Sequence, residues 1–344
     1  MSVRTRPARR RRLGGAAAVL ALVGTGCADT RQNFLEPEGD VARQLDRLWD
    51  PVFFIAGIFF FLVLGLVVFV AVRYREKDPD FVPKQLHGNA RLELGWTILP
   101  ALIMLGVGIF TVATIIDINR RPEGPDVLAV TVTGHQWWWE YEYPELGVVT
   151  ANELHIPIDT KVDVRLESDD VIHSFWPPKL AGKVDVIPGR TNYMTIEADK
   201  PGLYFGQCVE YCGLSHANMR LRVYAHERDD FDAWVVSQTA DPAVPADGSA
   251  AAGGRTLFRT KGCGGCHTIA GFAAGEVGPD LSHFATRDTF AGAIFDRNDT
   301  NLRRWLRDPP AEKPMDPGNN LGMPNLNLTD AEINSLIAYL NTLK

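Results

Sequence analysis

The stretch that most constrains the fold is Cys208-Val-Glu-Tyr-Cys212-Gly-Leu-Ser-His216-Ala-Asn-Met219. It places two thiols, an imidazole and a thioether within twelve residues, directly after a run with the character of a β-strand. Soft sulfur ligands combined with imidazole favour copper. A mononuclear blue-copper site uses a single cysteine. The second cysteine therefore indicates two thiolates that bridge two copper ions.

A binuclear site of this kind needs a histidine for each copper ion. The best candidate for the second imidazole is His173, in Val171-Ile-His-Ser-Phe-Trp176, although a loop histidine is more often a structural residue. Zinc is the alternative metal, because cysteine and histidine also form tetrahedral zinc sites. Met219 argues against zinc, since copper electron-transfer sites recruit thioethers and zinc sites do not.

Short runs of alternating apolar and polar residues precede the copper loop, at 128–133, 162–166 and 193–197. A period of two with Pro and Gly between the runs predicts an all-β sandwich or barrel over 122–235. Residues 122–232 hold 19 acidic and 9 basic side chains, whereas residues 253–344 hold 10 of each. Neither balance indicates binding to nucleic acid.

A second motif, Cys263-Gly-Gly-Cys266-His267, is the C-x-x-C-H signature of a covalently attached haem. In it both thiols form thioethers and the histidine binds iron. A redox-sensing dithiol is the alternative for the two cysteines, and His267 argues against it. The second axial ligand is expected to be a methionine about 50 residues later. Met315 and Met323 are both available, and Met323, just before the terminal helix, is the preferred ligand.

The haem motif lies in a C-terminal region with helical patterns. Residues 237–254 are rich in Ala, Pro, Gly, Ser and Asp and are predicted to be a flexible linker. Beyond them an all-α domain is expected over 255–344. Its predicted helices cover 255–261, 301–307 and 330–343. The last has apolar residues at i, i+3, i+4 and i+7, with Thr329 as the expected N-cap.

Two uncharged apolar runs, 52–72 and 97–116, are each long enough to cross a hydrocarbon core of about 30 Å. They predict a transmembrane hairpin over 45–120, with spans at about 51–72 and 97–117. Pro51 is expected at the start of the first helix, where its missing N–H costs nothing. The loop 73–96 has five basic residues and is expected in the cytoplasm.

The N-terminus has the pattern of an export signal over residues 1–27. Arginines at 9–12 precede an uncharged stretch and then Cys27. Gly24-Thr25-Gly26-Cys27 is similar to a bacterial lipoprotein cleavage site, which would leave Cys27 lipidated. Plain signal cleavage or an uncleaved anchor is the alternative, because a larger aliphatic residue than Gly24 is usual. The domains after the hairpin are therefore expected outside the cytoplasm, with metal and haem rather than disulfides explaining the other four cysteines.

Residues 45–230 resemble subunit II of the haem-copper cytochrome c oxidases. Besides the copper loop, the motifs that carry the resemblance are Asn89-x-x-Leu-Glu93-x-x-Trp96-Thr97, Gly134-His-Gln-Trp-Trp-Trp139-Glu-Tyr-Glu and Asp185-Val-Ile-Pro-Gly-Arg190. The C-terminal region resembles class I cytochromes c through Gly278-Pro279-Asp280-Leu281 and the terminal helix. The two resemblances together imply a transmembrane hairpin, a cupredoxin-like Greek-key sandwich and an all-α cytochrome c domain.

The resemblance also implies the ligands of the metal sites. The binuclear copper ligands match His173, Cys208, Cys212, His216 and Met219, together with the backbone carbonyl of Glu210. The side chain of Glu210 is implied to reach a magnesium ion at the interface with the catalytic subunit, since carboxylate suits that hard cation. A loop glutamate would otherwise be merely solvated.

Two further roles follow from the resemblance. Trp137 matches the indole through which electrons enter, whereas Trp138 and Trp139 are read as core aromatics. Glu93 matches a carboxylate near the entrance of a proton-uptake channel, although a glutamate at the membrane edge could equally be an interfacial charge.

The implied function is that of subunit II of a proton-pumping cytochrome c oxidase in a bacterial plasma membrane. Haem c passes electrons to the binuclear copper and from there to an oxygen-reducing catalytic subunit. Subunits I and III are the expected partners, and a quinol–cytochrome c reductase or a cytochrome c is the expected upstream donor. The alternative is a membrane-anchored copper and haem carrier for another reductase, which would need neither Glu93 nor Glu210. A quinol oxidase subunit is excluded because it lacks the copper ligands and the haem domain.

The linker suggests how the two centres meet. A short flexible tether gives an effective concentration of order mM, at which even a weak contact near Trp137 is substantially occupied. The haem domain is therefore expected to be the tethered donor of the copper site.

Overall fold

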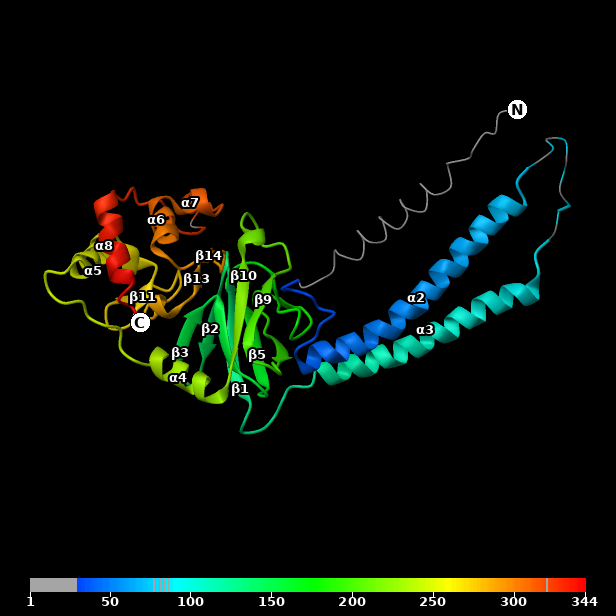
Figure 1. Cartoon of the computed structure of the whole chain (residues 1–344), viewed down its shortest axis with the longest axis horizontal. Helices are drawn as coiled ribbons and strands as arrows, with labels where there is room; N and C mark the ends of the chain where they lie inside the picture. Colours follow the sequence, from blue (N-terminus) through cyan, green and yellow to red (C-terminus); the bar gives the residue numbers. More distant parts are fainter. Residues whose placement is uncertain are drawn as a thin grey trace, which may run out of the picture.

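The computed structural model describes residues 30–344 except positions 77, 79, 81, 83, 86 and 320. The export signal and Cys27 lie outside the described residues. Three bodies follow one another along the chain (Figure 1): a helical hairpin, a β-sandwich, and a small C-terminal domain on the opposite side of the sandwich from the hairpin.

The hairpin consists of α2, Asp40–Arg73, and α3, Ala90–Ile118. Both helices are long and apolar enough to cross a membrane, and their apolar side chains are largely exposed. Asn89 caps α3, because its side chain accepts hydrogen bonds from the backbone N–H groups of Arg91 and Leu92.

The expectation that Pro51 starts the first helix is wrong, because α2 begins at Asp40 and Pro51 lies inside it. The first turns of α2 pack on the sandwich, where Ala42 is buried and Arg43 pairs with Asp199. These contacts extend the helix beyond the apolar run. Proline costs the helix one hydrogen bond here, which the packing offsets.

The sandwich consists of two five-stranded sheets, ordered β3-β2-β1-β5-β8 and β4-β10-β9-β6-β7. The strands are β1 Leu128–His135, β2 Trp138–Tyr143, β3 Val148–Ala151, β4 Glu153–Pro157, β5 Val162–Ser168, β6 His173–Trp176, β7 Val184–Val186, β8 Asn192–Ile196, β9 Gly202–Cys208 and β10 Arg220–His226. Strands distant in sequence are neighbours in both sheets, as in Greek-key folds. The prediction of an all-β sandwich is confirmed.

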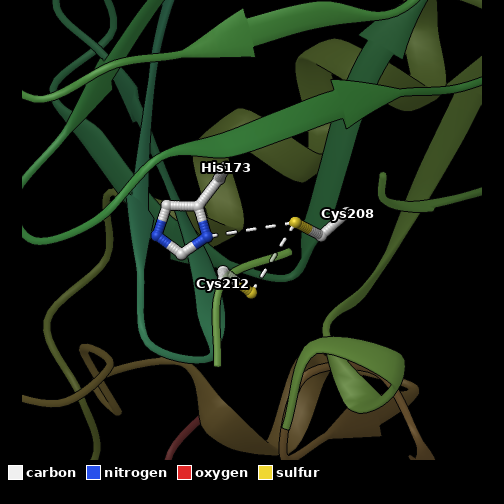
Figure 2. Close-up of side chains that lie close together, drawn as sticks. All are labelled: His173, Cys208 and Cys212. Carbon is white, nitrogen blue, oxygen red and sulfur yellow. Dashed lines mark hydrogen bonds between the residues drawn. The ribbon is translucent and has the colours of Figure 1, made fainter. Parts of the chain in front are cut away.

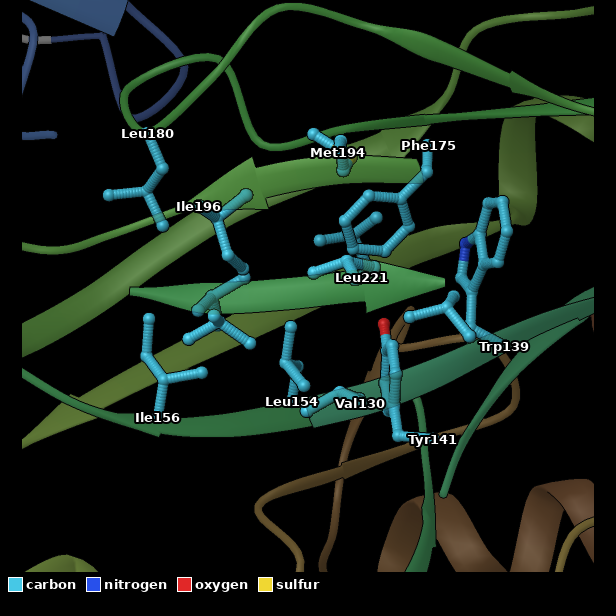
Figure 3. Close-up of a cluster of buried hydrophobic side chains, with 14 of the residues drawn as sticks. Val130, Trp139, Tyr141, Leu154, Ile156, Phe175, Leu180, Met194, Ile196 and Leu221 are labelled. Carbon is cyan, nitrogen blue, oxygen red and sulfur yellow. The ribbon is translucent and has the colours of Figure 1, made fainter. Parts of the chain in front are cut away.

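The core of the sandwich is built from alternate residues of its strands. The side chains of β1, β4, β5 and β6 that face inward meet between the sheets, with Phe175 against Trp139 and Tyr141 (Figure 3). Trp139 is fully buried in this core, as expected. The expectation that Trp138 is also a core aromatic is wrong, because its ring stacks on His135 outside the core cluster and lines a cavity on the side of the C-terminal domain. Burial of apolar area at about 25 cal/mol per Å² is the main stabilising term for such a core. A rigid core fixes the loops that join the strands.

The C-terminal domain is mainly helical. Its helices are α5 Ala250–Thr260, α6 Asp299–Arg307, the short α7 Pro309–Glu312 and α8 Asp330–Leu340. Thr329 caps α8 in a reciprocal capping box with Glu332, as the sequence predicts. Helices α5 and α8 cross closely at Gly254, where a Cβ would lie 1.9 Å from the carbonyl oxygen of Ser335. Glycine is therefore required at this crossing.

One expectation about this region needs correction. The predicted linker 237–254 is too long, because α4, Arg228–Gln238, extends into it and α5 begins at Ala250, with Ser249 as its N-cap. Alanines that read as linker composition are also strong helix formers. The C-terminal domain is helical, as expected, with two short strand pairs in addition. It contains the strand pairs β11 Thr268–Ile269 with β12 Ala273–Ala274, and β13 Thr289–Phe290 with β14 Phe295–Asp296.

Candidate metal and haem centres

The candidate copper site lies at one end of the sheet that contains β6, β9 and β10. Cys208 ends β9, and the loop that follows leads to β10. His173 begins β6, which pairs with β9 so that Phe175 lies opposite Cys208. The sheet therefore brings the distant histidine beside the cysteine loop, as the ligand hypothesis requires.

The two cysteines and His173 point toward one another (Figure 2). The two Sγ atoms are 3.8 Å apart, and His173 Nδ1 lies 3.9 Å from Cys208 Sγ. The candidate donor atoms of these three residues all lie within 4.8 Å of one another, and all three side chains are buried. Close, buried thiols beside an imidazole fit a site for soft metal ions.

The other candidate ligands surround the same pair of sulfurs. His216 Nδ1 is 3.6 Å and Met219 Sδ is 3.9 Å from Cys212 Sγ. The carbonyl oxygen of Glu210 is 3.2 Å from Cys208 Sγ. Each cysteine therefore has its own histidine, with the thioether on one side of the pair and the carbonyl on the other. This division suits two metal ions bridged by two thiolates.

The two thiols lose their protons one after the other as the pH rises. The hydrogen bond between the sulfurs lowers the pKa of Cys208 to about 4, and the same contact raises the pKa of Cys212. One thiolate is thus already present at neutral pH. Loss of the second proton is unfavourable until a cation compensates the charge, which is the behaviour expected of a metal-binding dithiol.

Asp170 orients His173 and was not anticipated from the sequence. Its Oδ1 lies 2.8 Å from His173 Nε2, which leaves Nδ1 facing the sulfurs. Such a hydrogen bond on the far ring nitrogen fixes the orientation of a ligand histidine. Burial lowers the pKa of His173, but the hydrogen bonds to Asp170 and Cys208 outweigh it and raise that pKa overall. The only sequence signal was an acidic residue three positions before the histidine.

Trp137 contacts the copper loop directly. Its indole N–H donates to the carbonyl oxygen of Cys212 at 2.9 Å, and the side-chain amide of Gln136 donates to the same oxygen at 2.7 Å. Trp137 is only 2% exposed. The side chain is therefore fixed against the candidate copper site.

The candidate haem site is a cavity of about 430 Å³. One wall holds Cys263, Cys266 and His267, and apolar residues of α6 and α8 form other walls. At the far end the cavity is lined by Trp137 and Trp138 of the sandwich. The cavity thus extends from the C-x-x-C-H motif to the tryptophan that contacts the copper loop.

His267 is held in an orientation that suits iron binding. Its Nδ1 lies 2.8 Å from the carbonyl oxygen of Pro279, so this nitrogen carries the proton and Nε2 remains for a metal. Burial lowers the pKa of His267 and keeps the ring neutral. Gly278 is required beside it, because a Cβ there would lie 2.6 Å from Cε1 of the imidazole.

The two candidate methionines both line the cavity. Met323 packs with the apolar cluster of the C-terminal domain, whereas Met315 packs against the core cluster of the sandwich. The thioether of Met315 also accepts a hydrogen bond from the backbone N–H of Met323 at 3.3 Å. Both thioethers therefore face the cavity, but Met315 also packs on the sandwich, whereas Met323 packs within the C-terminal domain.

Glu210 and Glu93, for which the resemblance implies magnesium binding and proton uptake, do not line the haem cavity. The Glu210 side chain is exposed and accepts from the backbone N–H of Tyr211 at 3.2 Å, while its carbonyl faces Cys208. Glu93, in the first turn of α3, is exposed and accepts from the backbone N–H of Asn89 at 3.2 Å. Both carboxylates are thus available to a partner subunit.

Three known families match successive parts of the chain. Residues 29–114 match the cytochrome c oxidase subunit II transmembrane domain, residues 148–226 its periplasmic domain, and residues 251–344 cytochrome c. Cytochrome c oxidase subunit 2 of Alkalihalophilus pseudofirmus is 37% identical over 337 residues, which cover 94% of this chain and 95% of the relative. The chain belongs to the cytochrome c oxidase subunit 2 family.

A second relative agrees with this assignment, and a solved structure is also similar to part of the chain. Cytochrome c oxidase subunit 2 of Bacillus sp. strain PS3 is 34% identical over 355 residues, covering 97% of both chains. The crystal structure of the periplasmic domain of subunit II from Bradyrhizobium japonicum is 32% identical and matches with a TM-score of 0.33. That match covers 35% of this chain and 96% of the other. This subunit 2 is thus a membrane protein of an oxidoreductase complex that contains a catalytic subunit, with a copper domain and a haem c domain that donates electrons.

Proposed function

We propose that this subunit 2 is the electron-entry subunit of a proton-pumping oxidase in a bacterial plasma membrane, with both soluble domains on the outer side. The proposal rests on the position of Trp137, which lines the haem cavity and donates a hydrogen bond to the Cys212 carbonyl. When bound, haem c supplies one electron at a time, and the binuclear copper accepts it and passes it to the oxygen-reducing subunit.

The copper ions would be held by the two bridging cysteines and their neighbours. The ligands we propose are His173, Cys208, Cys212, His216 and Met219, with the carbonyl of Glu210. The soft donor set within about 4 Å supports this choice. Asp170 holds the His173 ring, and the dense hydrogen bonding keeps the ligands in place as the charge of the site changes.

The haem would be attached through Cys263 and Cys266, with His267 and Met323 as axial ligands. The buried, neutral imidazole and the cavity wall formed by Met323 support this set. Methionine with histidine raises the haem potential. The lining of the cavity is mainly apolar and excludes water. Such surroundings favour the reduced haem iron, which carries less charge, and therefore also raise the haem potential.

Trp137 would be the point of electron entry into the copper site. Its ring lies between the cavity and the ligand loop, and its N–H fixes the carbonyl of a bridging cysteine. A rigid aromatic in van der Waals contact with both sides shortens the gap that an electron must cross. The Trp137 ring is therefore packed between the two domains and is not exposed to a soluble donor.

The two exposed glutamates would serve the assembled complex. We assign the Glu210 side chain to a magnesium ion at the interface with the catalytic subunit, because a carboxylate is a suitable hard ligand. Glu93 would lie near the entrance of a proton-uptake path, at the opposite end of the hairpin from the copper domain (Figure 1). Subunits I and III are the proposed partners, and a quinol–cytochrome c reductase or a cytochrome c is the proposed upstream donor.

The purified complex is expected to contain two copper ions and one covalent haem per copy of this chain. Metal analysis and paramagnetic resonance would detect two coppers that share one electron in the mixed-valence state. Mass spectrometry after denaturation would detect haem that stays with the polypeptide. One copper ion per chain, stoichiometric zinc, or haem that is extracted by acid acetone would overturn the proposal.

Replacing Met323 by alanine is expected to lower the haem reduction potential, because a thioether ligand raises it. Met315→Ala is the matched control, since it removes a thioether that lines the same cavity. Potentiometric titration of both variants separates the two candidates. A larger fall in Met315→Ala than in Met323→Ala would reverse the assignment.

A further inference from the structure

The C-terminal domain contacts the sandwich at Trp137 through a buried lysine. Lys313 is 3% exposed. Its Nζ donates to the carbonyl oxygen of Trp137 at 2.6 Å and to that of Ala291 at 3.0 Å. Within the described residues Lys313 forms no ion pair. A buried amino group is unfavourable unless its hydrogen bonds are satisfied, so this contact requires both carbonyl groups to be present.

The turn at 291–293 completes the contact. A Cβ at Gly292 would lie 2.7 Å from the carbonyl oxygen of Asn218 and 3.0 Å from that of Trp137, and the φ of Gly292 is +80°. The Gly292 carbonyl accepts from the backbone N–H of Arg220 at 3.0 Å. Only a glycine can approach this closely. The haem domain thus inserts a turn between Trp137 and the end of the copper loop.

Further contacts lie on both sides of the lysine. Ser215, within the copper loop, donates to the carbonyl of Pro314. At the other edge the buried carboxylate of Glu153 accepts from the backbone N–H and hydroxyl of Thr289, each at 2.6 Å, and from Asp288 N at 3.1 Å. Such charge-assisted hydrogen bonds are stronger than neutral ones. The interface is therefore specific rather than a transient contact of a tethered domain.

Hydrogen bonds link Trp137 both to the copper loop and to the haem domain. The indole N–H of Trp137 donates to Cys212, and the carbonyl of the same tryptophan accepts from Lys313. We propose that Lys313 is a positioning residue that fixes the haem domain over Trp137, so that the electron is transferred within a permanent dock. The inference rests on the proposed roles of Trp137 and the haem domain.

The test combines a lysine variant with a longer tether in the full complex. Gly-Ser insertions into 239–249 that triple its length should lower the effective concentration of an undocked domain by about fivefold. A docked domain should be unaffected. Haem-to-copper electron transfer after photochemical reduction of the haem would be measured in the parent chain, in Lys313→Met, and in both with the insertion.

The parent chain is expected to transfer electrons at the same rate with either tether. Lys313→Met should slow transfer by about tenfold or more, the effect of leaving two buried carbonyl groups without their donor. Transfer in this variant should also become sensitive to tether length. Lys261→Met is the matched control, because Lys261 pairs with Glu332 inside the haem domain. Haem and copper spectra, recorded separately, should be unchanged in every variant.

Three results would contradict the inference. Lys313→Met could transfer electrons at the parental rate, or its rate could be insensitive to tether length. The parent chain itself could slow with the longer tether, which would mean that its haem domain searches for the contact. Absence of copper reduction by the haem in the parent chain would overturn the proposed function as well.

Discussion

Trp137→Ala is expected to slow haem-to-copper electron transfer on the order of a hundredfold, a loss comparable to that caused by displacing reacting groups by about 1 Å. The indole is the wall between the haem cavity and the copper loop, and it holds the Cys212 carbonyl through a 2.9 Å hydrogen bond. Alanine removes both the ring and the donor. The rate would be followed optically after photochemical reduction of the haem.

Trp138→Ala is the matched control for this experiment. Trp138 lines the same cavity but stacks on His135, at 4.2 Å between ring centroids, and makes no hydrogen bond to Cys212. Copper and haem contents should be normal in both variants. Equal rates in the two variants, or a normal rate in Trp137→Ala, would remove the entry role of Trp137.

Cys212→Ser is expected to abolish the binuclear copper centre completely. The Cys212 sulfur lies within 4 Å of Cys208 Sγ, His216 Nδ1 and Met219 Sδ, so it is the donor shared by most of the site. Serine has nearly the same shape, which preserves the fold, but its hydroxyl is a hard and weakly acidic donor that does not replace the soft thiolate. Metal analysis and the mixed-valence resonance signal would record the loss.

Cys263→Ser provides the control for the cysteine variant. Cys263 lies in the haem domain, so its loss should remove one thioether to haem and leave two copper ions in place. Cys208→Ser should behave like Cys212→Ser. A Cys212→Ser protein that keeps two coppers with shared valence would exclude the bridging role.

The local motifs could be predicted because their members are close in sequence. Four of the proposed copper-ligand side chains lie within twelve residues, and the C-x-x-C-H motif lies within five. The metal or haem that each motif would bind can therefore be inferred without knowledge of the fold. His173 is 35 residues before Cys208, but the need for a second imidazole was sufficient to select it. The hairpin could be predicted from apolar length alone.

A contact of the haem domain near Trp137 was expected, but the residues that dock the two domains could not be predicted. Lys313 and Trp137 are 176 residues apart, and a lysine in a proline-rich segment usually lies in solvent. The amino-acid composition also led to wrong predictions of where helices α2 and α5 begin. The packing of α2 on the sandwich carried the helix past Pro51, and alanines near the linker formed the first turn of α5. Tertiary contacts decided the start of α2, whereas the Ser249 cap and the helix propensity of alanine decided the start of α5.

Docking also changes how the acidic charge of the copper domain is interpreted. Its excess of acidic residues would suit steering of a basic donor, but the haem domain occupies the face that contains Trp137. The tether was expected to supply proximity, and the specific contacts at Lys313, Gly292 and Glu153 now supply orientation. The surface charge is then free for other contacts of the complex.

Transfer within one docked chain is tested most directly by the concentration dependence of copper reduction after the haem is reduced by a light pulse. A single first-order rate that is the same over a wide range of enzyme concentration is expected, because donor and acceptor belong to one chain. A rate that rises in proportion to enzyme concentration would show that the electron arrives from another molecule, and would contradict transfer within the chain.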